Sequence, residues 1–217
     1  MSKVVTAKEA VSHIKDGDVL LIGGFLQGGI PDVLVGAVLE TDAKNLTIVS
    51  NDTGTAETNI IKLQQAGKVS KVMATYIGAN PETGRMMIED PTSVQLFPQG
   101  TLAEKIRAGG AGIAAFLTPT GVGTIVEEGK QKMELNGREY LLETALRGNV
   151  ALVHASVADE FGNCFMRGST KNFNAIMPAA CDYVAVEAEK IVPVGELDPE
   201  LVTVPGIFVD AVVKVGE

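Results

Sequence analysis

The sequence predicts an α/β protein built on an open, mostly parallel β-sheet with helices on both faces. Short apolar runs alternate with helical segments through the first half of the chain, which is the pattern of strand–helix–strand units. The 217 residues include no Trp and only 5% aromatics, so Val, Ile, Leu and Ala must fill the core. Such an aliphatic core is usual for parallel sheets covered on both faces. The length suits a single domain, and we draw no boundary within residues 1–217.

Individual elements follow from local patterns. Thr6 and Glu9 form a T-x-x-E capping box, so a helix is expected to run to about Ile14. Pro31 suits the first turn of a second helix, and Asp32 favours its positive end. A second box, Thr101 and Glu104, predicts a helix through residue 107. Other strands are expected at 19–22, 46–49, 72–77 and 94–97, and other helices at 60–66 and 81–88.

The pattern changes after residue 109. Asn136-Gly137 lies between two strand-like runs in 132–142, which is a strong hairpin signal. Buried strands are expected at 150–154 and 183–186, with a helix at 172–180 between them.

Composition and charge exclude several classes of function. The formal net charge is −9 and no Lys/Arg-rich run is present, so no nucleic-acid partner is expected. No apolar run approaches ~20 residues, so no membrane span is expected. The charged N-terminus does not resemble a signal peptide. Cys164 and Cys181 lack a CxxC partner and fit a reducing cytoplasm as free thiols. Two histidines and no cysteine cluster predict no metal site.

A glycine-rich loop is the first candidate for a binding site. It lies between an expected strand and an expected helix and contains Gly23, Gly24, Phe25, Leu26, Gln27, Gly28 and Gly29. Glycines permit close approach of a ligand to the backbone, and backbone N–H groups beside a helix N-terminus can bind an anion. A tight strand-to-helix turn with no ligand explains the same residues equally well.

A polar amide marks a second strand-to-helix junction, at Gln99 in the run Pro98 to Thr101. No catalytic triad or nucleophile elbow is visible. His13 is expected to be a solvated or hydrogen-bonded side chain of the first helix, and His154, at the end of a buried strand, to form a hydrogen bond in the core.

Several longer motifs resemble those of family I coenzyme A transferases, specifically their alpha subunits. They are the run Asp16 to Pro31 with its DG-x-x-LLIGGF core, SNDTG at 50–54, GANPETGR at 78–85, and Pro98 to Lys130. The resemblance covers essentially the whole chain. It implies the open sheet of the sugar-phosphate isomerase and CoA transferase type, and it is nearest to enzymes of acetate, acetoacetate and butyrate.

This resemblance implies a reaction and a partner. Coenzyme A passes from an acyl-CoA to a free carboxylate by a ping-pong route through a glutamyl-CoA thioester. In the family the glutamate lies in the beta subunit, within a Ser-Glu-Asn-Gly motif that this chain lacks. No catalytic nucleophile is therefore expected here, and Glu187 is interpreted as structural or interfacial.

By the same resemblance, residues 23–29 bind coenzyme A as a substrate, and no cofactor is held tightly. Asn51 and Gln99 are expected in the substrate pocket, because an amide donates without adding a charge. Two alternatives stay open: a sugar-phosphate isomerase of the same fold and a non-catalytic acyl-CoA-binding module.

Overall fold

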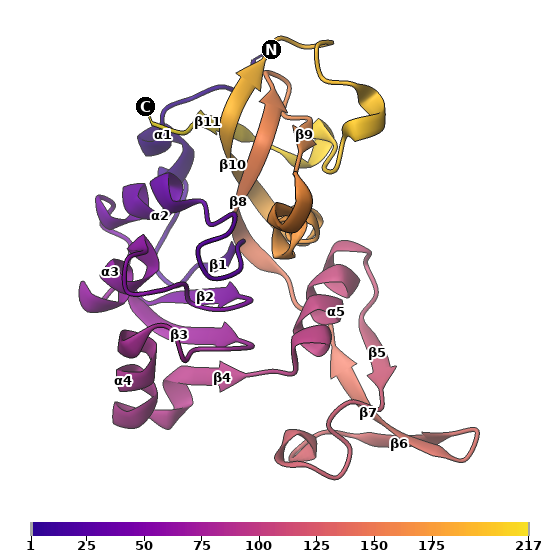
Figure 1. Cartoon of the computed structure of the whole chain (residues 1–217). Helices are drawn as coiled ribbons and strands as arrows, with labels where there is room; N and C mark the ends of the chain where they lie inside the picture. The colour runs from indigo at the N-terminus through magenta and orange to yellow at the C-terminus, as the bar shows by residue number, and fades with distance from the viewer. Residues whose placement is uncertain (1, 217) are drawn as a thin grey trace.

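The computed structural model describes residues 2–216 and contains an eight-stranded sheet (Figure 1). The strand order is β11–β10–β8–β1–β2–β3–β4, with β9 paired to β8 off this path. Every pairing along the path is parallel, and β8–β9 is antiparallel. This confirms the predicted mostly parallel sheet. Its strands are β1 (Val19–Ile22), β2 (Leu46–Ser50), β3 (Val69–Ala74), β4 (Val94–Leu96), β8 (Gly148–Asp159), β9 (Cys164–Phe165), β10 (Cys181–Val192) and β11 (Ala211–Lys214).

Helices cover both faces of the sheet because its strands are apolar on both sides. In β1, Leu20 and Ile22 join one core with apolar residues of α1, α2 and α3, while Leu21 between them joins a second core with α5. The first core is aliphatic, as the composition predicts, and the second adds Phe97 and Phe173 to its aliphatic residues. The helices are α1 (Ala7–Val11), α2 (Asp32–Leu39), α3 (Asn59–Gln65), α4 (Pro81–Glu89) and α5 (Gln99–Gly110). None of those among residues 2–216 has the length and apolar content needed to cross a membrane.

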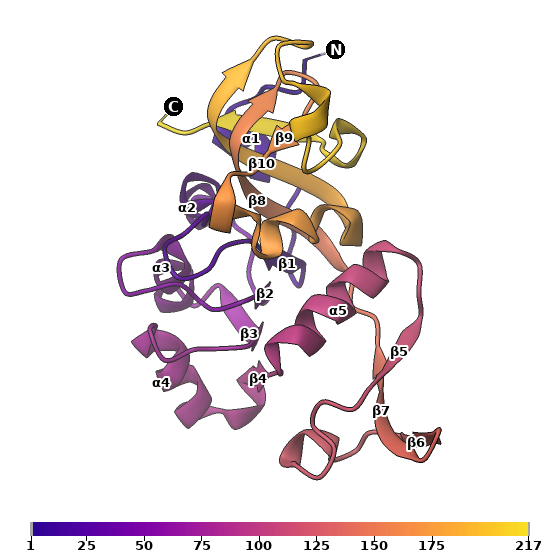
Figure 2. The same ribbon diagram turned by 45° about the vertical axis from the view of Figure 1, so that its right-hand side comes forward.

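A smaller antiparallel sheet extends beyond α5, away from the main sheet (Figures 1 and 2). Its order is β5 (Ala115–Thr118), β7 (Arg138–Thr144), β6 (Lys132–Leu135). Asn136 and Gly137 connect β6 to β7 with φ of 53° and 73°, the left-handed geometry of a two-residue hairpin turn. The predicted hairpin is confirmed.

The predicted start of α5 is wrong. The helix begins at Gln99 after Pro98, and Leu102 N donates to Pro98 O at 3.0 Å. Pro98, three residues before the expected cap, fixes φ at the position where the chain enters the helix. Thr101 therefore lies inside the helix, and its buried hydroxyl has no hydrogen-bond partner among the described residues. Glu104 forms an ion pair with Arg107 instead of a capping box.

The helix predicted at 172–180 is also wrong. That region consists of the short 3-10 turns Gly168–Lys171, Phe173–Ala175 and Pro178–Ala180. The side chains of Asn172 and Asn174 bond to the glycine loop, and Pro178 supplies no N–H, so a regular helix is not favoured. The remaining 3-10 turns are Pro91–Ser93, Ile125–Glu127, Pro199–Leu201 and Gly206–Phe208.

Other predicted elements occur with different bounds. The Thr6–Glu9 capping box is present, but α1 ends at Val11 rather than Ile14. Strands β8 and β10 are twelve residues each, much longer than their apolar centres suggested, because they pair with each other along nearly their whole length. As a result His154 lies in the middle of β8 and not at its end.

Candidate active site

The candidate site lies at the carboxyl edge of the main sheet, where open α/β sheets gather ligands. The glycine loop leaves β1, Asn51 and Asp52 leave β2, and Gln99 follows β4 as the first residue of α5. Strands β1 and β2 are paired in parallel register, so their ends meet. The turn segment 168–180 and α5 lie on the same side of these strand ends (Figure 2).

The loop after β1 is folded on itself by backbone hydrogen bonds. Phe25 N donates to Gly28 O at 3.0 Å, and Gly28 N donates to Phe25 O at 2.8 Å. Leu26 takes a φ of 51°, which is unusual for a residue with a β-carbon. Its N–H donates to both carboxylate oxygens of Asp52, at 3.1 and 3.0 Å. That charge-assisted bond helps to hold the left-handed turn in place.

Two asparagines in the segment of 3-10 turns, residues 168–180, form hydrogen bonds with the glycine loop. Asn172 accepts from Gly24 N at 3.1 Å and donates to Gly28 O at 3.2 Å. Asn174 donates to Gly29 O at 2.8 Å and accepts from His154 N at 3.0 Å. A β-carbon on Gly23 would come within 1.7 Å of the Asn174 carboxamide oxygen. Glycine at this position is therefore required by packing inside the protein itself.

Most donors of the loop are thus already used. Within residues 2–216, the backbone N–H groups of Gln27 and Gly29 are the two in the 23–29 segment without an intramolecular partner. Phe25 is 50% exposed and Leu26 36%, so the tip of the loop presents apolar side chains to its surroundings.

The N-terminus of α2 does not add free donors. The carboxylate of Glu187, on β10, accepts from Val33 N at 2.8 Å and from Leu34 N at 3.1 Å. Glu187 is 3% exposed and acts as the cap that Pro31 lacks. Its structural role agrees with the interpretation from sequence, and it means that the positive end of α2 already has an anion.

Gln99 and Asn51, both predicted for the substrate pocket, are in direct contact. Gln99 Nε2 donates to Asn51 Oδ1 at 2.7 Å. Gln99 is exposed and Asn51 is 1% exposed. Asn51 Nδ2 in turn donates to Asp52 Oδ2 at 2.7 Å, and Thr75 Oγ1 lies 3.0 Å from Asn51 Oδ1. A continuous chain of polar contacts therefore links Gln99 to the glycine loop.

His154 is paired with carboxylates rather than placed at the loop. Its Nε2 lies 3.2 Å from Glu189 Oε1, and its Nδ1 lies 3.7 Å from Glu187 Oε1. Burial alone would lower the pKa of His154, but the two carboxylates outweigh it and raise the pKa. The ring thus acts as a partner of the residue that caps α2.

Neither cysteine is poised to be a nucleophile. Burial raises the pKa of Cys164 and of Cys181 to about 12, so both thiols are protonated near neutral pH. Within residues 2–216 no group of three His, Cys, Asp or Glu side chains could hold a metal ion.

A buried ion cluster joins the small sheet to α5. Glu143 of β7 lies 3.0 Å from Lys105 of α5 and 2.5 Å from Lys130. Burial would raise the pKa of Glu143, but the two ammonium groups lower it. Since every charge in the cluster has a partner, its role is to hold the small sheet against α5.

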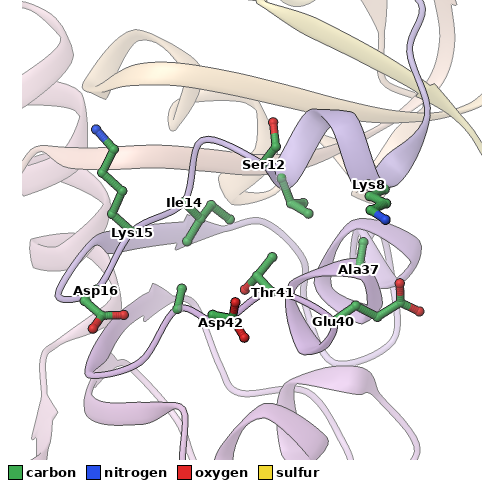
Figure 3. Close-up of a pocket in the computed structure, with 11 residues that line it drawn as sticks. Lys8, Ser12, Ile14, Lys15, Asp16, Ala37, Glu40, Thr41 and Asp42 are labelled. Carbon is green, nitrogen blue, oxygen red and sulfur yellow. The ribbon is translucent and has the colours of Figure 1, made fainter.

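A cavity of about 510 Å³ lies at the opposite edge of the sheet, between α1 and the C-terminal end of α2 (Figure 3). Two lysines, Lys8 and Lys15, and three acidic residues, Asp16, Glu40 and Asp42, line it, so its charges are mixed. It contains none of the predicted site residues. The predicted site residues lie instead at the carboxyl edge of the sheet.

The family model described as "Coenzyme A transferase" matches residues 4–215. This chain belongs to the coenzyme A transferase family. It is therefore a transferase, and coenzyme A is the substrate of the family.

Curated relatives match the chain from end to end. It is 46% identical over 213 residues to the acetoacetyl-CoA:acetate/butyrate CoA transferase alpha subunit of Clostridium acetobutylicum, covering 98% of both chains. It is 45% identical to the alpha subunit of the acetate CoA-transferase of Escherichia coli, covering 98% of this chain and 96% of that one. A human mitochondrial succinyl-CoA:3-ketoacid coenzyme A transferase is 42% identical, and this chain covers 43% of it.

Solved coenzyme A transferases share the fold. Glutaconate coenzyme A-transferase from Acidaminococcus fermentans superposes with a TM-score of 0.86 at 21% identity, over 98% of this chain and 75% of that one. An acyl-CoA transferase from Escherichia coli O157:H7 gives a TM-score of 0.85 at 24% identity; the chain spans 47% of its length.

Three residues of the site escaped the sequence analysis: Asp52, Asn172 and Asn174. Asp52 lies within the SNDTG motif that carries the resemblance, next to Asn51, but the motif assigns no role to it. The two asparagines lie inside a predicted helix, where nothing in the sequence connects them to a loop about 145 residues earlier.

Proposed function

We propose that this chain is the alpha subunit of a heteromeric CoA-transferase whose nucleophilic glutamate lies on the beta subunit. The complex moves coenzyme A between a short-chain acyl-CoA (acetyl-CoA, acetoacetyl-CoA or butyryl-CoA) and a free carboxylate. The observation that carries this proposal is the exposed Gln99 amide, held by Asn51 beside the glycine loop, where residues 2–216 supply no poised nucleophile. The names of the end-to-end relatives support both the reaction and the partner.

The proposed chemistry balances in four steps. A carboxylate oxygen of the partner's glutamate attacks the thioester carbonyl, and the coenzyme A thiolate leaves to give an acyl–glutamyl anhydride. The thiolate then attacks the glutamyl carbonyl and releases the first carboxylate. The second carboxylate attacks the glutamyl-CoA thioester and expels the thiolate. That thiolate attacks the new anhydride at its acyl carbon, which forms the second acyl-CoA and releases the glutamate carboxylate.

Gln99 has a role in each attack. Negative charge develops on the carbonyl oxygen, and the second N–H of the Gln99 amide can donate to it. A neutral donor suits this position because a cation there would also bind the free carboxylate and the glutamate. Asn51 is 1% exposed and already engaged, so its part in the pocket is to hold Gln99.

The glycine loop can offer coenzyme A only a few free groups, because most of its backbone N–H groups already have partners within the protein. We assign residues 23–29 to the binding of coenzyme A, with the N–H groups of Gln27 and Gly29 as donors and Phe25 and Leu26 as apolar contacts. The ligand is a substrate that leaves after each cycle. The two free thiols favour a cytoplasmic location for the complex.

Reconstitution tests the proposal. The purified chain is assayed with acetyl-CoA and butyrate, alone and with a cognate beta subunit, and the glutamyl-CoA thioester is sought by mass spectrometry of both polypeptides. We expect turnover only in the mixture, with the coenzyme A adduct confined to the beta subunit. Glu187→Gln serves as a control because it removes a buried glutamate of this chain while keeping an acceptor at α2. Turnover by the isolated chain, or an adduct on it, would contradict the proposal.

A further inference from the structure

We infer that Asp52 is a positioning residue: through Asn51 it sets the direction in which the Gln99 amide donates. This inference rests on the proposed function, because it concerns how Gln99 comes to present a donor. Asp52 is 5% exposed and does not reach the surface where a substrate would lie. Its effect must therefore pass through other side chains.

The first step is the chemistry of Asp52. Its Oδ1 accepts from Gly54 N at 2.9 Å, and its Oδ2 accepts from Asn51 Nδ2 at 2.7 Å. Both oxygens accept from Leu26 N, and Asp52 forms no ion pair within residues 2–216. An ionised carboxylate offers only acceptors, so the group that faces it must be a donor.

The second step is the orientation of Asn51. A carboxamide can be turned over with little change in shape, and its orientation is decided by its hydrogen bonds. Asp52 requires the NH₂ group of Asn51 on its own side. The carbonyl oxygen of Asn51 must then face Gln99, where the distance to Nε2 is 2.7 Å. Thr75 Oγ1 lies 3.0 Å from the same oxygen but 2.7 Å from the backbone O of Asn51, and its single proton can serve either acceptor, so the carboxylate of Asp52 decides the orientation.

The third step is the consequence for Gln99. Because Asn51 presents an acceptor, Gln99 must present its NH₂ group, and one N–H of that group stays available at the surface. Each amide also polarises the next, which strengthens donation at the exposed end. If the carboxylate were absent, both amides could turn over, and Gln99 would be held through its oxygen instead.

Asp52→Asn tests the relay with little change in shape. The Oδ1 atom that remains can keep the bonds to Leu26 N and Gly54 N, which places the introduced NH₂ group against Asn51. Asn51 is then expected to turn over and to donate toward Gln99, so that Gln99 accepts. Assayed in the complex with the beta subunit, kcat should fall at least about tenfold, a large part of the ~10²–10³ that one oxyanion donor provides. The KM for acyl-CoA should change less than kcat.

The paired variant Asn51→Asp/Asp52→Asn is designed to restore function. The carboxamide introduced at position 52 would donate to the carboxylate introduced at position 51, and that carboxylate would again accept from Gln99 Nε2. We expect kcat to return to within about threefold of wild type, which a merely structural role for Asp52 does not predict. Asp52→Asn combined with Gln99→Ala should lower kcat no further than Gln99→Ala does alone, because both changes remove the same interaction.

Asp159 provides a matched control. Like Asp52 it is a buried carboxylate, 2% exposed, that accepts from two backbone N–H groups and from an asparagine Nδ2, at 2.7 Å from Asn163. Its asparagine bonds onward to Gly206 N rather than to Gln99. Asp159→Asn should cost a similar amount of stability and leave kcat unchanged.

Failure of the relay through Asp52 and failure of the proposed role of Gln99 would give different results. If Gln99→Ala lowers kcat but Asp52→Asn does not, the relay is wrong and the proposed function stands. If Gln99→Ala itself has no effect on kcat, the assigned role of Gln99 fails. If Asp52→Asn alone does not assemble, the paired variant still decides: kcat near wild type supports the relay, and a loss of about tenfold or more in an assembled complex overturns it.

Discussion

Helices α2 and α5 begin in the same way, but they differ in whether a side chain accepts hydrogen bonds from the backbone N–H groups of the first turn. Each follows a strand of the main sheet, and each has a proline as its N-cap with no side-chain hydrogen bond from that residue. At α2, Glu187 of β10 accepts from the first-turn N–H groups. At α5, Gln99 and Gly100 are exposed and the described residues supply no side-chain cap. The comparison indicates that α2 is completed by the chain itself, whereas α5 is left open where a ligand would lie.

The largest expected effect is a loss of turnover from a substitution at the uncapped N-terminus of α5. Gln99→Ala should lower kcat of the complex by ~10²–10³, because an oxyanion donor is lost. Unfolding of the isolated chain should change little, since Gln99 is exposed. The two measurements are steady-state kinetics after reconstitution and urea unfolding. A kcat within about threefold of wild type would remove Gln99 from the site.

At the N-terminus of α2, which Glu187 caps, a substitution should lower stability rather than kcat. Glu187→Ala leaves two backbone N–H groups without an acceptor and removes one of the two carboxylate partners of His154, so the free energy of unfolding should fall by about 2–4 kcal/mol. Glu187→Gln keeps one acceptor and should lose less. Urea unfolding of the two variants measures the difference. A kcat loss in stably assembled Glu187→Gln complex would mean that α2 is not purely structural.

The pH dependence of stability should also involve Glu187, because His154 contacts it. The pKa of His154 is raised in the folded protein, so protonation favours folding. This contribution is fully present below the ordinary histidine pKa of about 6.5 and is lost as pH rises through the folded value. His154→Gln should therefore flatten the decline in unfolding free energy above about pH 6.5. An unchanged slope would show that another group is responsible.

The smallest effect is expected at Thr101 in the first turn of α5. Its hydroxyl is buried without a partner among the described residues, so Thr101→Val, nearly the same shape, should raise the free energy of unfolding by about 1 kcal/mol. Turnover should be unaffected. If kcat fell about tenfold instead, the hydroxyl would belong to the ligand site, and the open end of α5 would be larger than Gln99 alone.

Local patterns predicted the parts of the fold that depend on neighbouring residues. The Thr6–Glu9 box and the Asn136-Gly137 turn formed as expected, because their geometry is decided within a few residues. The apolar runs also formed strands, but with other bounds: the strand predicted at 72–77 is Val69–Ala74. The same logic failed at Thr101, where Pro98 set the helix start, and at 172–180, where asparagine side chains bond to a distant loop.

For the site, the sequence by itself determined which residues are available. The glycine loop, Asn51 and Gln99 are all candidates from their sequence context, and Asn51 and Gln99 are joined at 2.7 Å. Only the tertiary structure decided how they are used. Glu187 lies about 150 residues from the helix it caps, and Asn172 lies 148 residues from Gly24, whose N–H it accepts. Such bonds form only when parallel strands bring distant segments to one edge, and a chain read residue by residue does not specify which donors will remain free.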